Sequence, residues 1–282
     1  MHNFDYSLLE KQTWDSEILN YIEKIHEYKE KQNLYFSQKQ IQLSNLAKVA
    51  VFQSTESSNS IEGIVTSHSR LVRLLNNAAI PMNEDEEEIL GYKDCLDTIH
   101  KNYDCIPLES NYILQLHKIL LGHTSLSFKG KYKTTPNEIV SITKNGEKNV
   151  LFRPLEPFET PGAMERLCAT FNKEIELKRV EPLILILNFV LDFLCIHPFN
   201  DGNGRISRLL TLLLLNKSGF IVGKYISIEK VIDENKDLYY KTLKESDENW
   251  HEEKNDSSYF IKYMLAVILK CYIELNDATI DI

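Results

Sequence analysis

The sequence feature that most constrains the fold is a loop rich in charge and glycine between two apolar runs. The loop, residues 197–208, reads HPFNDGNGRISR. The run before it (183–196) and the run after it (209–215) consist almost entirely of apolar residues. Helices that are hydrophobic nearly all round are packed on every side. We therefore expect two central helices, joined by a loop that reaches the surface at one end of a helical bundle.

Most of the remaining sequence has the apolar spacing of amphipathic helices. One helix is expected to start at a capping box formed by Ser37 and Gln40. It is expected to end at Gly63, because glycine accepts the left-handed conformation that stops helices. Another helix is expected to start at Asn83, where the acidic run 84–88 would complement the helix dipole.

One segment, 137–154, departs from this helical pattern. It has two short β-prone runs on either side of Asn145-Gly146, the strongest turn signal for a short hairpin. A lone two-stranded hairpin is marginally stable, so we expect it to lie on the helical body with at least one strand edge unpaired. The predicted fold class is therefore all-α, a helical bundle that carries one β-hairpin.

Composition argues against several partners and compartments. The chain has 41 acidic and 32 basic residues and no run of Lys or Arg, so we expect no nucleic-acid partner. The longest apolar run is too short for a membrane span and includes Asn188 and Asp192, so we expect no membrane partner. Five scattered cysteines without a Cys-x-x-Cys pair favour reduced thiols and a cytoplasmic location.

The glycines of the loop predict an anion site. Gly202, Asn203 and Gly204 would open the second central helix, where unpaired backbone N–H groups and the helix dipole both favour an anion. Arg205 and Arg208 are three positions apart, so both side chains can face the same mouth. Two guanidinium groups over an anion pocket suit a polyphosphate better than a single phosphate.

Two further residues of the loop have side chains suited to phosphate chemistry. Asp201 is a natural ligand for Mg²⁺, which binds through few carboxylates plus substrate oxygens. His197 can act as a general base near neutral pH. Taken singly, these features have structural alternatives: a tight turn, a surface salt bridge or a packing histidine. Their combination in one loop favours a site. His117 and His123, by contrast, are expected to be surface or packing histidines.

The loop resembles the signature of Fic domain proteins, H-P-F-x-[D/E]-G-N-G-R-x-x-R, at every fixed position from His197 to Arg208. The resemblance implies a Fic-type all-helical bundle with a β-hairpin flap. It implies an N-terminal helical region over 1–80, a Fic core over 81–250 and a C-terminal helix over 251–282 packed on the core. Most Fic proteins transfer AMP from ATP to a hydroxyl side chain of a target protein.

The same resemblance implies a role for each residue of the loop. His197 would deprotonate the target hydroxyl, and Asp201 would hold Mg²⁺ on the α- and β-phosphates. Gly202, Asn203 and Gly204 would line the anion hole. Arg205 would bind the outer phosphates, and Phe199 would anchor the loop in the core.

Residues outside the loop have implied roles as well. Tyr239 and Tyr240 resemble a pair near the nucleotide base, for which simple packing is the alternative. The hairpin resembles a flap that aligns a target segment by strand addition, with Ile139, Val140, Ser141 and Ile142 as docking residues. Before the flap the sequence departs from many relatives, with Lys133 in place of Arg.

A second motif, SSNSIEG, lies at the end of the helix that stops at Gly63. Ser58 and Glu62 are one turn apart and share a face. The structural alternative is that they are simply polar residues at the end of a helix that stops at Gly63. The motif also resembles the inhibitory motif S/T-x-x-x-E-[G/N] of Fic proteins. That resemblance implies that Glu62 pairs with Arg208 and keeps it from the γ-phosphate.

Three functions stay open on the sequence. The first is an autoinhibited AMP-transferase acting on a Ser, Thr or Tyr hydroxyl of a protein target, with self-modification and homo-oligomers both open. The second is a related enzyme that removes AMP or transfers phosphate. The third is a module that only binds nucleotide, against which the intact His197 and Asp201 argue.

Overall fold

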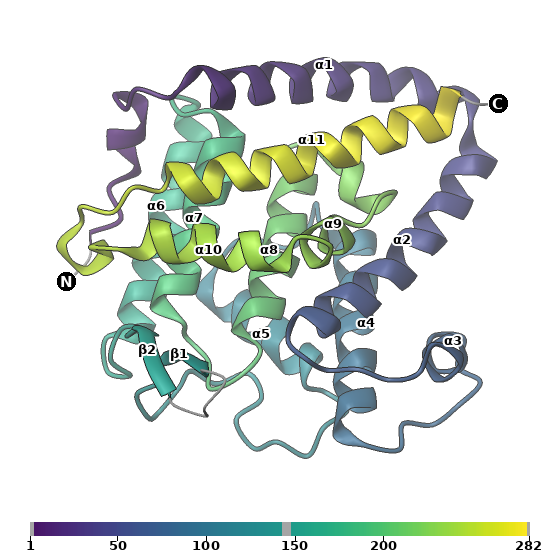
Figure 1. Ribbon diagram of the computed structural model, residues 1–282, viewed down its shortest axis with the longest axis horizontal. Coiled ribbons are helices and arrows are strands. Elements are labelled where there is room, and N and C mark those ends of the chain that lie inside the picture. Colours follow the sequence, from purple (N-terminus) through teal and green to yellow (C-terminus); the bar gives the residue numbers. More distant parts are fainter. Residues whose placement is uncertain (1–2, 143–147, 281–282) are drawn as a thin grey trace.

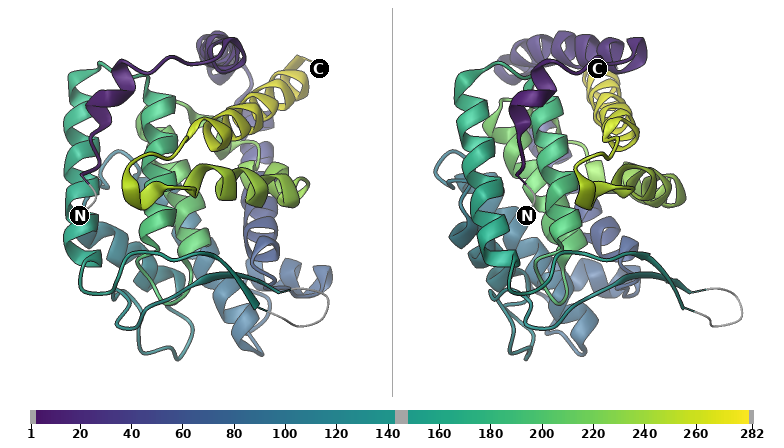
Figure 2. Two further views of the ribbon diagram at one scale, coloured as in Figure 1. Left: turned by 60° about the vertical axis from the view of Figure 1, so that its left-hand side comes forward. Right: turned by 90° about the vertical axis from the view of Figure 1, so that its left-hand side faces the viewer.

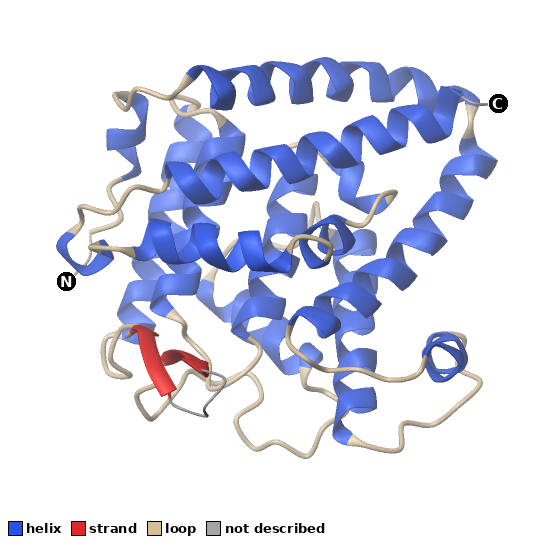
Figure 3. Cartoon of the chain, in the orientation of Figure 1, coloured by secondary structure: helices blue, strands red, loops and turns tan. Residues whose placement is uncertain are grey.

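The computed structural model describes residues 3–142 and 148–280, and side chains within these ranges except at 33–38, 141–142 and 280. The described residues form eleven α-helices, three short 3₁₀ helices and one two-stranded sheet (Figures 1 and 3). The predicted all-α bundle with one hairpin is confirmed. The elements, in chain order, are η1 (Tyr6–Glu10), α1 (Ser16–Gln38), α2 (Gln40–Ile61), α3 (His68–Leu75), α4 (Glu84–Asn102), α5 (Ser110–Leu120), β1 (Ile139–Ile142), β2 (Lys148–Phe152), α6 (Thr160–Leu177), α7 (Pro182–Ile196), α8 (Asn203–Lys217), η2 (Ile221–Lys224), α9 (Ile228–Asp233), α10 (Lys236–Asp247), η3 (Trp250–Glu252) and α11 (Ser258–Ile280).

Helices α7 and α8 form the centre of the bundle, as the two apolar runs predict. Nearly all of their side chains are buried. Helix α7 packs against α6, α8, α10 and α11, while α8 also contacts α2, α4 and α5. The loop that joins α7 and α8 lies beside the hairpin, at the lower end of the bundle in Figure 1.

The ends of two helices test the expectations from capping. Helix α4 starts after Asn83, whose Oδ1 accepts the Glu86 N–H at 2.9 Å, as predicted. The expected capping box at Ser37 is wrong, because α1 continues to Gln38 and α2 begins only at Gln40, without a side-chain cap. Helix α2 ends as predicted, with Gly63 at a φ of 81°.

The hairpin pairs β1 with β2 in antiparallel register, with Ile139 opposite Phe152 and Ser141 opposite Asn149. Figure 2 shows it along the lower edge of the helical body. Phe152 is buried and contacts the ring of Trp250 at 6.2 Å between centroids, which attaches the hairpin to the bundle. The predicted Asn145-Gly146 turn lies outside the described residues.

Helices α1 and α11 run side by side along the upper edge of Figure 1. The rings of Tyr28 and Tyr272 stack between them at 6.4 Å. The division of the chain at residues 80 and 250 stays a prediction. Within the described ranges, no helix combines the length and the apolar character that crossing a membrane requires.

Candidate active site

His197 sits at the point where α7 ends. Its backbone is left-handed, with φ 50° and ψ 61°, and its N–H donates to the Phe193 carbonyl at 3.0 Å. The ring Nδ1 lies 3.2 Å from the Leu194 carbonyl oxygen, so Nδ1 carries the proton and Nε2 keeps a free lone pair. Burial lowers the pKa of His197 to about 4, which leaves the ring neutral at neutral pH.

The loop after His197 is fixed from inside. Phe199 is fully buried and stacks on the ring of His117 at 3.8 Å between centroids. The Asn203 side chain bonds both the N–H and the carbonyl of Phe199, at 2.9 and 2.8 Å. Asn203 therefore shapes the loop through its side chain, while its backbone N–H opens α8.

His117 contributes to this scaffold in a way that its sequence position did not indicate. Its Nδ1 accepts the Gly130 N–H at 3.0 Å, so its Nε2–H donates to the Asp201 carbonyl at 3.1 Å. Burial lowers the pKa of His117 to about 4. The expectation of a packing histidine is right as far as it goes, but this ring also holds the backbone of the loop.

Lys133 and Asn137 support the end of α7 from the segment before the flap. Lys133 is buried, and its Nζ donates to the Ile196 carbonyl at 3.0 Å and to Asn137 Oδ1 at 2.8 Å. Asn137 Nδ2 in turn donates to the Phe199 carbonyl at 3.0 Å. Lys133 therefore links the segment before the hairpin to the end of α7.

The first turn of α8 presents unpaired donors. The N–H groups of Asn203, Gly204 and Arg205 have no acceptor within the described part of the chain, as expected for the start of a helix. Gly202 adopts a φ of 81°, which a side chain would strain, and a Cβ there would lie 3.0 Å from Leu120. A Cβ at Gly204 would clash with the carboxylate of Glu62.

Arg208 is held by the end of α2. Its Nε donates to Ser58 Oγ at 2.8 Å, and its Nη2 donates to the Ser58 carbonyl at 2.9 Å and to Glu62 Oε1 at 2.7 Å. Burial opposes the charge on Glu62, but Arg208, Arg205 and His197 outweigh it and keep the pKa of this carboxyl below its usual range. The two residues of the second motif and the last arginine of the loop are thus brought together.

Arg205 lies in a different environment from Arg208. It is 1% exposed, and its Nη2 forms an ion pair with Glu88 of α4. The expectation that the acidic run 84–88 serves only the helix dipole is therefore incomplete. Spacing gave no signal for this pair, because α4 and α8 meet only through tertiary packing.

Asp201 is the most accessible charged group of the loop. Its side chain is 54% exposed, and Oδ1 accepts the Gly202 N–H at 2.6 Å while Oδ2 lies 3.5 Å from Arg205. The described residues contain no cluster of three or more metal-ligating side chains. One open carboxylate next to an anion site fits Mg²⁺, which commonly completes its shell with substrate phosphates and water.

A cavity of about 530 Å³ joins eight of the predicted site residues. Tyr239 is buried and Tyr240 is 43% exposed, and their rings contact each other at 5.4 Å. The predicted residues that line the cavity are Glu62, Ile139, Val140, His197, Gly204, Arg208, Tyr239 and Tyr240. Those that do not line it are Ser58, Gly63, Phe199, Asp201, Gly202, Asn203 and Arg205. The side chains of Ser141 and Ile142 lie outside the described part.

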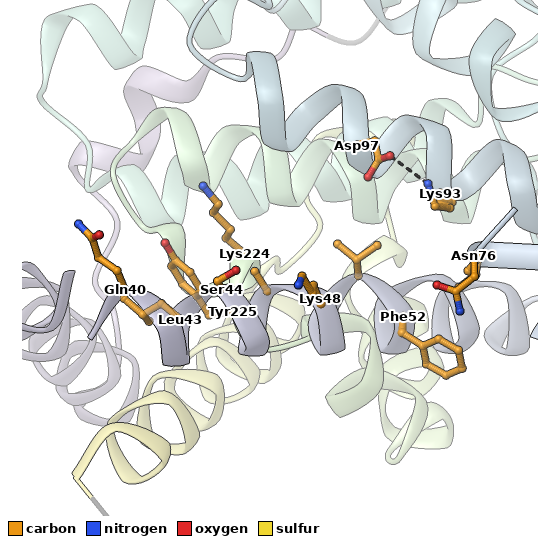
Figure 4. Close-up of a pocket in the computed structure, with 13 residues that line it drawn as sticks. Gln40, Leu43, Ser44, Lys48, Phe52, Asn76, Lys93, Asp97, Lys224 and Tyr225 are labelled. Carbon is orange, nitrogen blue, oxygen red and sulfur yellow. Dashed lines mark hydrogen bonds and ion pairs between the residues drawn. The ribbon is translucent and has the colours of Figure 1, made fainter. Parts of the chain in front are cut away.

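A larger groove of about 740 Å³ runs along α2 (Figure 4). Figure 4 shows Lys93 and Asp97 of α4 paired beside it, with Lys224 and Tyr225 on another wall. Lys93 Nζ donates to Asp97 Oδ2 at 3.0 Å. No predicted site residue whose side chain is described lines this groove. The smaller cavity is therefore the better candidate, because it contains the neutral histidine, the arginine and the N-terminus of α8.

Comparison with known proteins points to the same family as the loop motif. A family model described as the Fic/DOC family matches residues 107–215. A Fido domain-containing protein of Dictyostelium discoideum is 30% identical over 112 residues, which cover 38% of this chain and 73% of that protein. A protein adenylyltransferase Fic of Nematostella vectensis is 28% identical over 185 residues, 61% of this chain and 39% of that relative. The chain thus spans well under half of the latter protein's length.

The fold is also shared with solved structures. The crystal structure of a Fic family protein from Desulfovibrio desulfuricans superposes with a TM-score of 0.76 at 20% sequence identity. The superposition covers 94% of this chain and 76% of that one. The likeness therefore extends over nearly all of the helical body, well beyond the residues that the family model matches.

Proposed function

Because the chain belongs to the Fic/DOC family, we propose that it is a protein adenylyltransferase, which moves AMP from ATP to a hydroxyl side chain of a target protein. We further propose that Glu62 holds it inactive. The observation that carries this proposal is the contact between Glu62 Oε1 and Arg208 Nη2, 2.7 Å long, at the cavity that His197 also lines.

His197 is the proposed general base. The Leu194 carbonyl fixes its Nδ1–H, so the free lone pair on Nε2 can accept the proton of the target hydroxyl. The hydroxyl oxygen then bonds to the α-phosphorus, the bond to the β-phosphate oxygen breaks, and pyrophosphate leaves. The negative charge of a bound triphosphate would raise the pKa of His197 from its low value towards the working range.

The start of α8 is the proposed phosphate site. The unpaired N–H groups of Asn203, Gly204 and Arg205 would bind the α-phosphate, where the helix dipole adds to the attraction. Arg208 would grip the γ-phosphate through its two-pronged guanidinium. Asp201 would hold Mg²⁺, which neutralises charge on the phosphates. Arg205 would attract the outer phosphates through its positive charge, although its side chain is buried.

Tyr239 and Tyr240 would hold the nucleoside, and the flap would hold the target. Within the described residues β1 has β2 on one side only, so its other edge is free to pair with an extended segment. Ile139 and Val140 line the cavity, which would bring such a segment close to His197. A flap that binds the target mainly through its backbone accepts a Ser, Thr or Tyr hydroxyl in a segment of suitable length.

Removal of AMP is a second candidate, and the position of Glu62 favours it. Its carboxylate contacts Gly204 and contributes to the pKa of His197, so it lies beside the proposed α-phosphate site. A carboxylate there can orient a water molecule for attack on a phosphodiester. The two activities share a site and differ in whether Glu62 inhibits or assists.

Labelled ATP distinguishes these functions. Wild-type protein and Glu62→Gly are each incubated with α-labelled or γ-labelled ATP, with and without cell lysate. We expect α-label on protein from Glu62→Gly, with self-labelling seen in the reactions that lack lysate. Only γ-label would indicate phosphotransfer, and no label from either form would count against a transferase. Release of label when wild type is added to a labelled target would indicate AMP removal.

A further inference from the structure

Helix α2 carries a polar stripe that is longer than the inhibitory motif. Ser54, Ser58 and Glu62 follow one another at one-turn spacing, so they share one face of the helix. Ser54 is 3% exposed and Ser58 is fully buried. Ser58 and Glu62 contact Arg208, while Ser54, one turn earlier, contacts a different partner.

That partner is Glu229, a buried carboxylate near the start of α9. Ser54 Oγ lies 2.7 Å from Glu229 Oε2, and Ser227 Oγ lies 3.3 Å from the same oxygen. The Tyr92 hydroxyl of α4 donates to Glu229 Oε1 at 2.9 Å. In the described part of the chain no Lys, Arg or His pairs with Glu229, so these three hydroxyls solvate it.

Tyr92 ties this carboxylate to α4. It is fully buried, and burial together with Glu229 raises the pKa of its phenol. Ser58 and Arg208 act on the pKa of the phenol in the opposite direction. Glu229 is therefore tied to α2 through Ser54 and to α4 through Tyr92, and the same face of α2 holds Arg208 through Ser58 and Glu62.

We infer that Ser54, Tyr92 and Glu229 are positioning residues. They fix the rotation of α2 about its axis and its position along that axis, so that Glu62 meets Arg208. The inference rests on the proposed function, since it concerns how the inhibited state is held. A buried carboxylate needs its donors, so the helix face that supplies one of them cannot turn away without loss. The anchor lies two turns from Glu62, close enough to set its position along the helix axis.

The test uses Ser54→Ala and Tyr92→Phe, each of which removes one donor to Glu229. We expect each variant to label protein with α-labelled ATP about tenfold more than wild type does, since losing one such donor shifts an equilibrium by roughly that factor. In a Glu62→Gly background neither change should add anything. Changes that merely weaken the fold would lower labelling in both backgrounds, and that result would overturn the inference.

The matched control is Thr55→Val on the same helix. Thr55 is equally buried, but its hydroxyl donates only to the Val51 carbonyl within α2, at 2.7 Å. This variant removes a buried hydroxyl without touching Glu229. It should label protein no more than wild type does, and a rise equal to that of Ser54→Ala would overturn the inference.

Hydrogen exchange gives a readout that does not depend on catalysis. The amides of residues 57–62 should exchange about tenfold faster in Ser54→Ala and Tyr92→Phe than in wild type, relative to the amides of α7. Unchanged exchange in both variants would overturn the inference whatever their labelling. Faster exchange with no labelling by any variant, Glu62→Gly included, would support the anchor and contradict the proposed function instead.

Discussion

The carboxylate of Glu62 and the guanidinium of Arg208, 146 positions apart in the sequence, meet at 2.7 Å. Arg208 is almost fully buried, while 31% of the Glu62 side chain is exposed. The arginine therefore has little freedom to move, and the glutamate is the partner that can leave. This asymmetry makes Glu62 the residue whose removal should change the site most cleanly.

We predict that Glu62→Gly increases labelling of both targets and the protein itself by α-labelled ATP. Freed from the carboxylate, Arg208 can take the γ-phosphate and bring the α-phosphate in line with the attacking hydroxyl. A misplacement of about 1 Å can change a rate on the order of 10²-fold. Gel autoradiography of wild type, Glu62→Gly, and Glu62→Gly with Arg208→Ala measures this. Equal labelling by wild type and Glu62→Gly would contradict autoinhibition, and the double variant should lose the gain.

Gly204→Ala should destabilise wild type but not Glu62→Gly. In wild type the new methyl group meets the Glu62 carboxylate, an overpacking that typically costs about 1–3 kcal/mol. Without that carboxylate the substitution gains helix propensity of roughly 1 kcal/mol. Thermal unfolding of the four proteins in the absence of nucleotide gives the comparison. The same shift in Tm in both backgrounds would mean that Glu62 does not occupy this space in solution.

His197→Ala should abolish AMP transfer in the Glu62→Gly background while leaving ATP binding largely intact. A positioned general base commonly contributes roughly 10²–10⁴-fold to a rate, and in the proposed role the imidazole would contact little of the ground-state nucleotide. Initial rates with α-labelled ATP and calorimetric titration with ATP separate the two effects. Transfer at an undiminished rate would show that another group takes the proton.

Acid should destabilise the protein in a way that depends on His117. The folded pKa of His117 is about 4, below the ordinary value of about 6.5 for histidine. The unfolded chain therefore binds the proton first as the pH falls. Neutral His117 makes its full contribution to the free energy of unfolding above pH ~6.5. That contribution is lost as the pH falls from ~6.5 towards ~4, at up to ~1.4 kcal/mol per pH unit.

Urea unfolding of wild type and His117→Gln between pH 7 and pH 5 measures this contribution. The free energy of unfolding of the variant should fall less steeply with pH, by the slope that corresponds to about one proton taken up on unfolding. His100 and His197, whose pKa values are lowered in the same way by burial, are present in both proteins and cancel in the comparison. Parallel pH profiles would mean that His117 is solvated in the folded state.

Hydrophobic patterning and capping preferences, which depend only on neighbouring residues, predicted the central helices and two helix ends. The two apolar runs located the central helices, Asn83 located the start of α4, and Gly63 located the end of α2. The start of α2 was missed, because a plausible capping box at Ser37 lies inside a helix that simply continues. Capping residues state a preference, and packing of the long helix α1 against α11 overrides it.

Contacts between distant elements were beyond the sequence. Nothing in the run 84–88 marks Glu88 as the partner of Arg205, and nothing in α5 marks His117 as the support of the Asp201 carbonyl. Both contacts depend on how helices from separate parts of the chain pack against α8. The pairing of Glu62 with Arg208 was predicted only because a family resemblance supplied the relation that spacing could not.

The left-handed backbone of His197 lowers the stability of the protein at a residue that the proposed activity requires. A side chain in this conformation costs about 1–2 kcal/mol, a penalty that glycine avoids. At the end of α7, folding alone would select glycine, and the chain carries an imidazole there instead. Mutants recovered for greater thermal resistance should therefore include His197→Gly, and these more stable proteins should be inert. The residue proposed as the general base is one that selection for stability alone would replace.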